Sequence, residues 1–412
     1  MNLAEPSEVR ESHLTRAWVA RQPIIDRRGG TFAYEIMLRS RPSSIGPDAD
    51  TSAVALLTAF SEVGIDEICG VDTKALFRID PGVFHSEALD ALPKHRVILG
   101  LDPRAFSEAR DHIRLAALTR AGFRFAVAAE DSSADPLLRD AELATLDMSS
   151  SGVDFARRAD AVLRTGARLI ARRVETHEEQ RRAMDVGCHF MQGLFFQVPE
   201  MVSGTHIPTD RAAVLALLAK AQREDTSLAE LERLVSGDAT LSYRLLRLFR
   251  MARFHTVQRV DSVKRAIVML GRRPLSKWLS LLALAGIDDR PSALLEQSIV
   301  RARMCEILGK KFPAHPPAAF FTVGLLSSLD AMLSRPLPIV LAQVDLDPAL
   351  EAALIERKGI LGQVLSAVID YESGEWRSLD MSAVDPAQLG DAYFDAARYG
   401  VEVMAELGRR GR

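Results

Sequence analysis

Short strand-like runs alternate with helical runs through the first half of the chain, and this alternation constrains the fold more than any other feature. Seven runs between Trp18 and Pro208 have the β-branched, aromatic and alternating pattern of strands: AWVARQPII, TFAYEIML, ALFRID, RVILGL, FRFAVAA, LATLDM and ARLIARRV. Helix candidates between them include SAVALLTAFSEV, SEARDHIRLAALTRAG, DFARRADAVLRTG and THEEQRRAMDVG. Repeated β-then-α units predict parallel strands covered by helices, and their number favours an α/β barrel.

The length of this first part leaves the completeness of the barrel open. It spans roughly 190 residues, whereas about 250 are typical of a (β/α)8 barrel, so one or more helices could be missing. From residue 208 onward nearly every run has the period of a helix, with Pro and Gly at turn-like positions. The sequence therefore predicts two domains: an α/β barrel over residues 15–207 and an all-α helical domain over residues 208–412.

Composition restricts the classes of partner. Of the 412 residues, 48% are apolar and 26% are charged, and the formal charge is −3. Such a near-neutral chain argues against nucleic acid as a partner. No apolar run is long enough to span a membrane, and the first residues lack a secretory signal pattern, so we expect a cytoplasmic protein without a membrane partner. The three cysteines are widely spaced, which argues against a disulfide framework or a zinc site.

The segment VARQPIIDRRGGTFAYEIMLRS resembles the opening of EAL domains in the bacterial EAL–HDOD (YuxH-like) signalling family. The residues that carry the resemblance are Gln22-Pro23-Ile24, Asp26, Tyr34-Glu35 and Arg39, followed by Val174-Glu175-Thr176 and Gln192-Gly193. EAL domains are barrels that, when active, hydrolyse cyclic di-GMP with metal ions. The resemblance therefore implies an EAL-type barrel in which Glu35, Glu175 and Gln192 keep family positions and Arg39 stands where active relatives touch the nucleotide.

Most of the other expected metal-site positions are altered in this chain. Aligned by eye, the replacements are Arg78 for an asparagine, Gly100 for a glutamate, Ala128-Ala129 for an Asp-Asp pair, Thr145 for a lysine and Arg172 for a glutamate. A guanidinium close to a divalent ion is strongly repelled, and Gly and Ala offer no oxygen ligand. We therefore expect no metal, no cofactor and no catalytic residue in the barrel.

Two roles remain open for the altered pocket. In the first, Arg78 and Arg172 pair with Glu35 and Glu175, so that internal ion pairs replace the charge of the metal. In the second, the two arginines form an anion site that binds a phosphate without metal, assisted by Arg39.

The second half resembles an HDOD domain, through the segment from LLAKAQREDTSLAELERLVSG to KRAIVMLG. HDOD domains resemble HD-type metal phosphohydrolases whose catalytic His-Asp has been lost, and here Ser327 and Ser328 follow the Gly-Leu-Leu where that pair would stand. The resemblance therefore predicts that this half is not an enzyme either.

A basic helix face in the second half has two interpretations. On a 3.6-residue helix, Leu241, Leu245, Leu248 and Phe249 share one stripe. The opposite half carries Arg244, Arg247, Arg250 and Arg253. These arginines form either an ordinary solvated face or a docking surface for an acidic protein partner.

The leading hypothesis is a non-catalytic interaction scaffold in a cyclic di-GMP, stress or motility pathway. Family resemblance suggests a sensor kinase or a diguanylate cyclase as its partner. The alternatives are a metal-independent cyclic dinucleotide sensor and, more remotely, a cyclic di-GMP phosphodiesterase.

Overall fold

The computed structural model describes residues 18–39, 64–106, 108–131, 134–149, 152–199, 209–223, 225–251, 262–287, 290–344, 346–373 and 384–408. The chain divides into two compact units. The first runs to Phe195 and also includes residues 385–394, and the second begins at Phe196. Each unit is described by itself. The predicted helix SAVALLTAFSEV lies outside the described residues.

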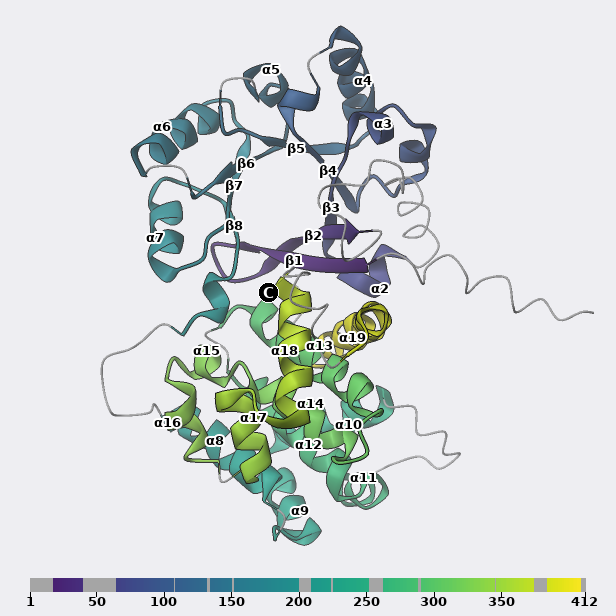
Figure 1. Ribbon diagram of the computed structural model, residues 1–412, viewed down its shortest axis with the longest axis vertical. Coiled ribbons are helices and arrows are strands. Elements are labelled where there is room, and N and C mark those ends of the chain that lie inside the picture. Colours follow the sequence, from purple (N-terminus) through teal and green to yellow (C-terminus); the bar gives the residue numbers. More distant parts are fainter. Residues whose placement is uncertain are drawn as a thin grey trace, which may run out of the picture. The chain divides into compact units, whose positions relative to one another are not determined.

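Eight strands close into a barrel in chain order, so the predicted α/β barrel is confirmed and it is closed (Figure 1). The strands are β1 (Trp18–Asp26), β2 (Thr31–Arg39), β3 (Lys74–Arg78), β4 (Val97–Leu101), β5 (Arg124–Ala128), β6 (Leu143–Asp147), β7 (Arg168–Arg172) and β8 (Phe190–Gln192). The sequence pattern missed β8, whose three residues are too few to show an alternation.

The expectation of parallel strands throughout is wrong for β1. This strand is antiparallel to both β2 and β8, whereas all other neighbouring pairs are parallel. Only four residues separate β1 from β2, too few for a crossover helix, so the chain reverses in a turn. Asp26 fixes that turn because its Oδ1 accepts hydrogen bonds from the backbone N–H groups of Arg28 and Gly30.

Helices lie outside the ring of strands in Figure 1. In the barrel unit they are α2 (Ile65–Cys69), α3 (Pro81–Phe84), α4 (Ala109–Arg120), α5 (Asp135–Leu138), α6 (Gly152–Leu163) and α7 (His177–Asp185). Helix α7 begins with a capping box, in which Thr176 Oγ1 accepts from the Glu179 backbone and the Glu179 carboxylate accepts from the Thr176 backbone. Glycines with positive φ follow α4, α6 and α7, as is common after helix ends: Gly122, Gly166 and Gly187.

One apolar layer fills the middle of the barrel. It takes one buried residue from each strand: Ile24, Ala33, Leu76, Ile98, Ala126, Leu143, Ile170 and Phe190. Because side chains two positions apart on a strand face the same side, this layer fixes which residues above and below it also point toward the barrel axis.

The described part of the second unit contains helices and no strand. Its helices are α8 (Thr209–Gln222), α9 (Leu228–Ser236), α10 (Ala239–Met251), α11 (Val263–Leu270), α12 (Arg272–Leu284), α13 (Ser292–Gly309), α14 (Pro317–Leu326), α15 (Leu329–Leu333), α16 (Leu337–Leu341), α17 (Pro348–Glu356) and α18 (Gly359–Ser373). A last helix, α19 (Pro386–Glu406), begins in the barrel unit and ends in this one. Among the described residues, no helix has the length and apolar character needed to cross a membrane.

Gly193 should be essential for the end of β8. A Cβ there would lie 2.0 Å from the carbonyl oxygen of Val174, and φ is +158°. We predict that Gly193→Ala lowers the free energy of unfolding of the barrel by about 3 kcal/mol or more, measured by urea denaturation. Gly166→Ala is the matched control, because it also has positive φ but no atom within 4 Å of the added Cβ. It should cost only about 1 kcal/mol. Equal losses in the two variants would contradict the steric argument.

Candidate functional site

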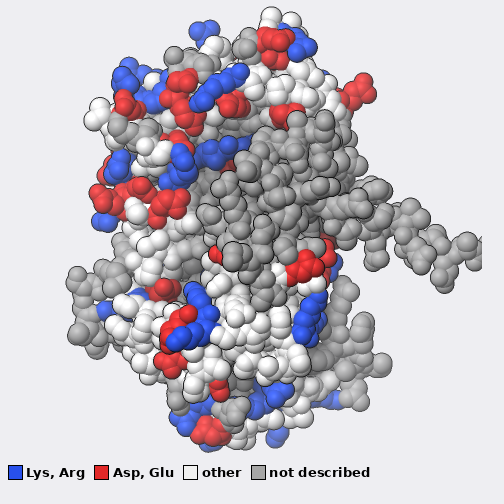
Figure 2. Space-filling view, viewed as in Figure 1, with Lys and Arg blue, Asp and Glu red and all other residues white. Residues whose placement is uncertain are grey.

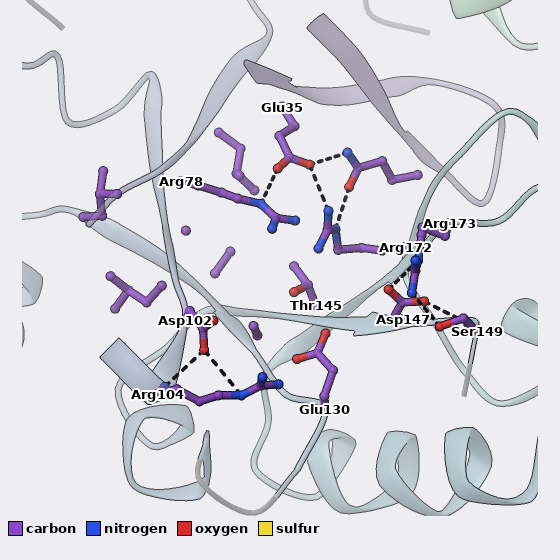
Figure 3. Close-up of a pocket in the computed structure, with 17 residues that line it drawn as sticks. Glu35, Arg78, Asp102, Arg104, Glu130, Thr145, Asp147, Ser149, Arg172 and Arg173 are labelled. Carbon is purple, nitrogen blue, oxygen red and sulfur yellow. Dashed lines mark hydrogen bonds and ion pairs between the residues drawn. The ribbon is translucent and has the colours of Figure 1, made fainter. Parts of the chain in front are cut away.

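Polar side chains gather at the carboxyl end of the barrel, where barrel proteins usually place their active sites. They line a pocket of about 470 Å³ (Figure 3). Its polar lining consists of Glu35, Arg78, Asp102, Arg104, Glu130, Thr145, Asp147, Ser149, Arg172, Arg173 and Gln192.

Glu35, on β2, is the buried carboxylate of this pocket, with only 5% of its surface exposed. Arg78 Nε donates to Glu35 Oε1 at 2.5 Å, and Arg172 Nη2 lies 3.7 Å from Glu35 Oε2. The side-chain amide of Gln192 also donates to Oε2. Both carboxylate oxygens are therefore occupied by donors from the chain itself, as burial of a charged group requires.

The alternation of each strand brings these donors to the same place. Arg78 stands two residues after Leu76 on β3, and Arg172 stands two residues after Ile170 on β7. Leu76 and Ile170 belong to the apolar layer, so both arginines also point inward, one level closer to the pocket.

Gln192 on β8 connects the ion pairs to β1. Its Nε2 donates to Gln22 Oε1 at 2.8 Å as well as to Glu35, while its Oε1 accepts from Arg172 Nε at 3.3 Å. Donor and acceptor ends of the amide are thus both used, and its orientation is determined by its neighbours.

Gly100 leaves room for Arg78. The two residues are register partners on β4 and β3, and a Cβ at position 100 would lie 3.3 Å from Leu76 Cδ2 and 3.4 Å from Arg78 Cγ. An added Cβ would thus be in tight contact with Leu76 and in ordinary contact with the stem of Arg78, so the glycine leaves the arginine more room than a larger residue would.

A second ion pair lies at the ends of β6 and β7. Arg173 Nε is 2.6 Å from Asp147 Oδ2, and Arg173 Nη2 donates to Ser149 Oγ at 2.6 Å. Burial opposes ionisation of Asp147, but hydrogen bonds from Arg173 and Ser149 outweigh it and hold the pKa of Asp147 below its usual range. Arg173 has φ of +52°, a left-handed conformation that is uncommon for a non-glycine residue.

The charges of the pocket are balanced. Its four arginines, Arg78, Arg104, Arg172 and Arg173, are matched by four carboxylates, Glu35, Asp102, Glu130 and Asp147. Basic and acidic side chains are also intermingled on the barrel surface in view in Figure 2. The pocket therefore has no large field of one sign that would attract an anion from a distance.

Sequence reasoning missed part of this lining. Asp102, Glu130, Asp147 and Arg173 lie at, or within two residues of, the carboxyl ends of their strands. The position just after a barrel strand is a signal that could have found them.

The structure does not bring Glu175 into the pocket. Its side chain is exposed and accepts from the Leu194 backbone N–H, and no ion pair in the described part of the chain joins it to Arg78 or Arg172. The expected pairing of Glu175 with these arginines is therefore wrong. Left-handed Arg173 turns the chain between Arg172 and Glu175, which ends the strand alternation that the prediction assumed. The side chain of Arg39 lies outside the described part of the structure.

The pocket residues do not fit a divalent metal. Within the described ranges, no group of three or more His, Cys, Asp or Glu side chains lies together in a way that could hold a metal ion. At about 4 Å and an effective dielectric of about 20, a divalent ion beside one guanidinium is repelled by roughly 8 kcal/mol, and less beside Arg78, whose side chain is 56% exposed. The arginines and a metal therefore compete for Glu35.

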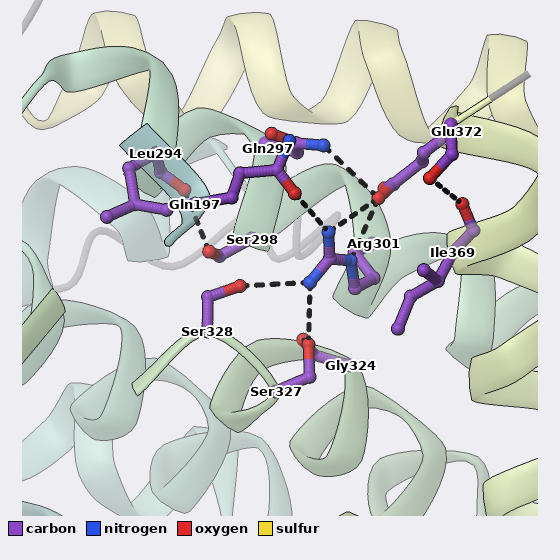
Figure 4. Close-up of polar contacts among 11 residues, drawn as sticks. Gln197, Leu294, Gln297, Ser298, Arg301, Gly324, Ser327, Ser328, Ile369 and Glu372 are labelled. Carbon is purple, nitrogen blue, oxygen red and sulfur yellow. Dashed lines mark hydrogen bonds and ion pairs between the residues drawn. The ribbon is translucent and has the colours of Figure 1, made fainter. Parts of the chain in front are cut away.

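A buried polar cluster lies in the second unit, around Arg301 on α13 (Figure 4). Arg301 Nη2 lies 2.7 Å from Glu372 Oε2 on α18, and 6% of each side chain is exposed. Arg301 Nη1 donates to the hydroxyl groups of Ser327 and Ser328 at 2.9 and 3.0 Å. The two serines thus accept from a cation of the chain, at the position where the resemblance places the His-Asp pair of an active relative.

The basic face of α10 is described only in part. Leu245, Leu248 and Phe249 are buried, as the helical stripe predicts. On the other side, Arg247 Nε already pairs with Glu406 Oε2 at 2.9 Å, and Arg244 is partly exposed. The side chain of Arg250 and all of Arg253 lie outside the described residues. Docking through this face stays a prediction.

Comparisons with known proteins give a matching domain family and similar proteins. Residues 207–336 match the HDOD domain family. The chain is 22% identical over 406 residues to "Uncharacterized protein YuxH" of Bacillus subtilis, covering 93% of this chain and 98% of YuxH. It is 26% identical over 396 residues to "Cyclic di-GMP phosphodiesterase CdgJ" of Vibrio cholerae, covering 91% of this chain and 89% of CdgJ. The EAL domain of Mycobacterium smegmatis DcpA is similar to 43% of this chain and 90% of its own, with 21% identity and a TM-score of 0.36.

A closed α/β barrel followed by helices of the HDOD type defines the class of this protein. The chain carries an HDOD domain, and its resemblance to the EAL–HDOD proteins is confirmed.

We predict that Glu35→Gln lowers the free energy of unfolding of the barrel by about 2 kcal/mol, because it leaves two guanidinium groups without their carboxylate. Urea denaturation measures the loss. Glu130→Gln is the control, since burial, together with the charges of Asp147 and Asp102, raises the pKa of Glu130. Its charged form costs stability at neutral pH, so this second variant should be neutral or slightly stabilising. Equal stability of Glu35→Gln and the parent would contradict the structural role of the ion pairs.

Arg301→Met should lower the free energy of unfolding of the helical unit by about 3–5 kcal/mol, because the buried carboxylate of Glu372 loses the cation at position 301. The double variant Arg301→Met/Glu372→Met should lose less than Arg301→Met alone, since no buried charge remains at the pair. Denaturant unfolding of both variants measures this coupling. A double variant as unstable as the sum of the two single variants would show that the pair does not act as a unit.

Proposed function

We propose that this chain is a non-catalytic protein of a cyclic di-GMP signalling network, which acts through protein contacts of its barrel and its HDOD domain. One observation carries the proposal: Arg78 Nε lies 2.5 Å from the carboxylate of Glu35, with Arg172 on its other oxygen. The assignment to cyclic di-GMP signalling is supported by similarity to CdgJ, which is named a cyclic di-GMP phosphodiesterase.

Loss of catalysis follows in this proposal from the chemistry of hydrolysis. Two-metal hydrolysis needs oxygen ligands that hold both ions and a water that is ionised between them. Here the arginines at positions 78 and 172 occupy the retained carboxylate, and Gly100 and Ala128 present no ligand atom to the pocket. The name of CdgJ does not decide the question for this chain, because an overall identity of 26% leaves individual positions free to differ.

The proposed output is a protein contact. The candidate partners are the two protein classes that the family resemblance suggests, a sensor kinase and a diguanylate cyclase. Within the second unit, the exposed ring of Tyr243 and the adjacent Arg244 and Arg247 offer a surface for an acidic partner. Arg247 contributes less than an isolated arginine would, because Glu406 already neutralises it.

A metal-independent cyclic dinucleotide sensor is the second candidate. In its favour, Arg78 is 56% exposed at the side chain, and its Nη atoms have no hydrogen-bond partner among the described residues. They could hold a phosphate while Nε keeps Glu35. Against it stands the balanced charge of the pocket.

The test is incubation of the purified protein with cyclic di-GMP in the presence of Mg²⁺ or Mn²⁺, followed by recovery of the nucleotide. We expect intact nucleotide at the level of the protein-free control, because no metal pair forms at Glu35. CdgJ, assayed alongside, should show hydrolysis under the same conditions. Metal-dependent turnover by this chain would overturn the proposal.

The same samples distinguish scaffold from sensor by a binding titration without metal. Absence of binding supports the scaffold. The sensor is supported if binding of the intact nucleotide is lost in Arg78→Ala but retained in Arg164→Ala, a variant in the exposed turn after α6. Binding that Arg78→Ala leaves unchanged would remove the role proposed for this arginine.

A further inference from the structure

Basic residues also occupy the opposite, amino-terminal end of the barrel. Lys74, Arg124 and Arg168 are the first residues of β3, β5 and β7. Each stands two positions before a member of the apolar layer, so each points toward the barrel axis below that layer. In the ranges that the structure describes, these three strands thus present cations at one end of the barrel.

Aromatic rings form the floor beneath these cations. Phe32 packs against the apolar layer and stacks on Phe190, with ring centroids 4.0 Å apart. Lys74 Nζ and Arg168 Cζ each lie 5.3 Å from the centre of the Phe32 ring, and Arg168 Cζ is 4.4 Å from that of Phe190. Lys74 and Arg168, from different strands, therefore both contact the Phe32 ring, and cation–π attraction stabilises this arrangement. We call Phe32, Lys74, Arg124 and Arg168 the amino-end cluster.

The amino-end cluster has more positive than negative charge. Arg124 Nε pairs with Glu142 Oε2 at 3.3 Å. Neither Lys74 nor Arg168 has an ion pair with a carboxylate in the described part of the chain. Asp26, the last residue of β1, accepts backbone N–H groups of its own turn through Oδ1 and is not among the charges that act on Lys74, so it is not counted in the cluster. Three cations against one carboxylate leave a surplus of two positive charges.

The surplus positive charge affects the pKa of Lys74. Burial is the largest cause that lowers the pKa of Lys74, and the charges of Arg124, Arg168 and Arg96 lower it further, while the charge of Glu142 raises it. Arg96 itself is paired with Asp66 and adds no unpaired charge. Repulsion between like charges decreases when an anion binds among them, so anion binding lowers the free energy of such a cluster.

We propose that the amino-end cluster binds a dianionic phosphate group, with Lys74 and Arg168 as its principal donors above Phe32. The surplus of two charges matches a phosphate dianion, and the guanidinium of Arg168 can donate to two phosphate oxygens at once. Arg124 is partly exposed and contributes the third positive charge while it remains paired with Glu142. This site lies at the opposite end of the strands from the Glu35 pocket, and it does not depend on the function proposed for that pocket.

The test is calorimetric titration of the full chain with inorganic phosphate above pH 7.5, at constant ionic strength set with chloride. Binding with a dissociation constant of about 1 mM or tighter is expected. Lys74→Met and Arg168→Met should each weaken it about tenfold or more, because each removes a charge-assisted donor. Arg164→Met removes the same charge from the exposed turn after α6 and is the control for net charge.

Two further variants keep the result decisive. Lys74→Arg retains the charge and should retain binding. If Lys74→Met does not fold, the comparison is between Arg168→Met, which should weaken binding, and Lys74→Arg, which should not. Arg172→Met reports on the other end of β7. Phosphate binding that disappears in Arg172→Met but persists in Lys74→Met and Arg168→Met would overturn the proposal. So would the absence of phosphate binding by the parent chain, or binding that none of these substitutions weakens.

Discussion

Burial of the Glu35 carboxylate inside a protein barrel requires compensating positive charge, and the rest of the pocket depends on how that charge is supplied. Here two guanidinium groups supply it, from β3 and β7. Gln192 fills the remaining donor role and links the pair to β1. Gly100 leaves the space that Arg78 occupies. Each of these residues is explained by the same electrostatic requirement, without a metal ion.

In the helical unit, a buried carboxylate is likewise compensated by a guanidinium group of the chain. Arg301 lies among Glu372 and the two serines at the position of the resembling family's His-Asp pair. In both units a cation that is covalently part of the chain occupies a polar centre. Such a cation cannot exchange or dissociate, and breaking a buried pair is costly. Both centres therefore favour one fixed conformation, which suits a protein that presents surfaces to partners.

Much of the fold could be predicted from the sequence because it depends on local periodicity. Alternation identified seven of the eight strands. The three residues of β8 are too few to show a period. The antiparallel β1 could have been inferred from the short segment before β2, since a crossover needs more residues.

The site could be predicted only where strand alternation continues. Arg78 and Arg172 meet Glu35 because each is two residues from an inward-facing aliphatic residue. The predicted pairing of Glu175 was wrong because left-handed Arg173 breaks the alternation. A single non-glycine residue with positive φ leaves no clear signal in the sequence. The partner of Arg247, Glu406, lies 159 residues away, so no local pattern could reveal that its charge is neutralised.

In the proposed role, guanidinium groups compensate the charge of Glu35 and no divalent ion does. The most direct measurement is Mn²⁺ binding to the purified chain by electron paramagnetic resonance, in which the free ion gives a strong signal that bound ions lose. We expect the signal of free Mn²⁺ to be undiminished by the protein. Stoichiometric loss of the free-ion signal that Glu35→Gln abolishes would contradict it, because the carboxylate would then be a metal ligand.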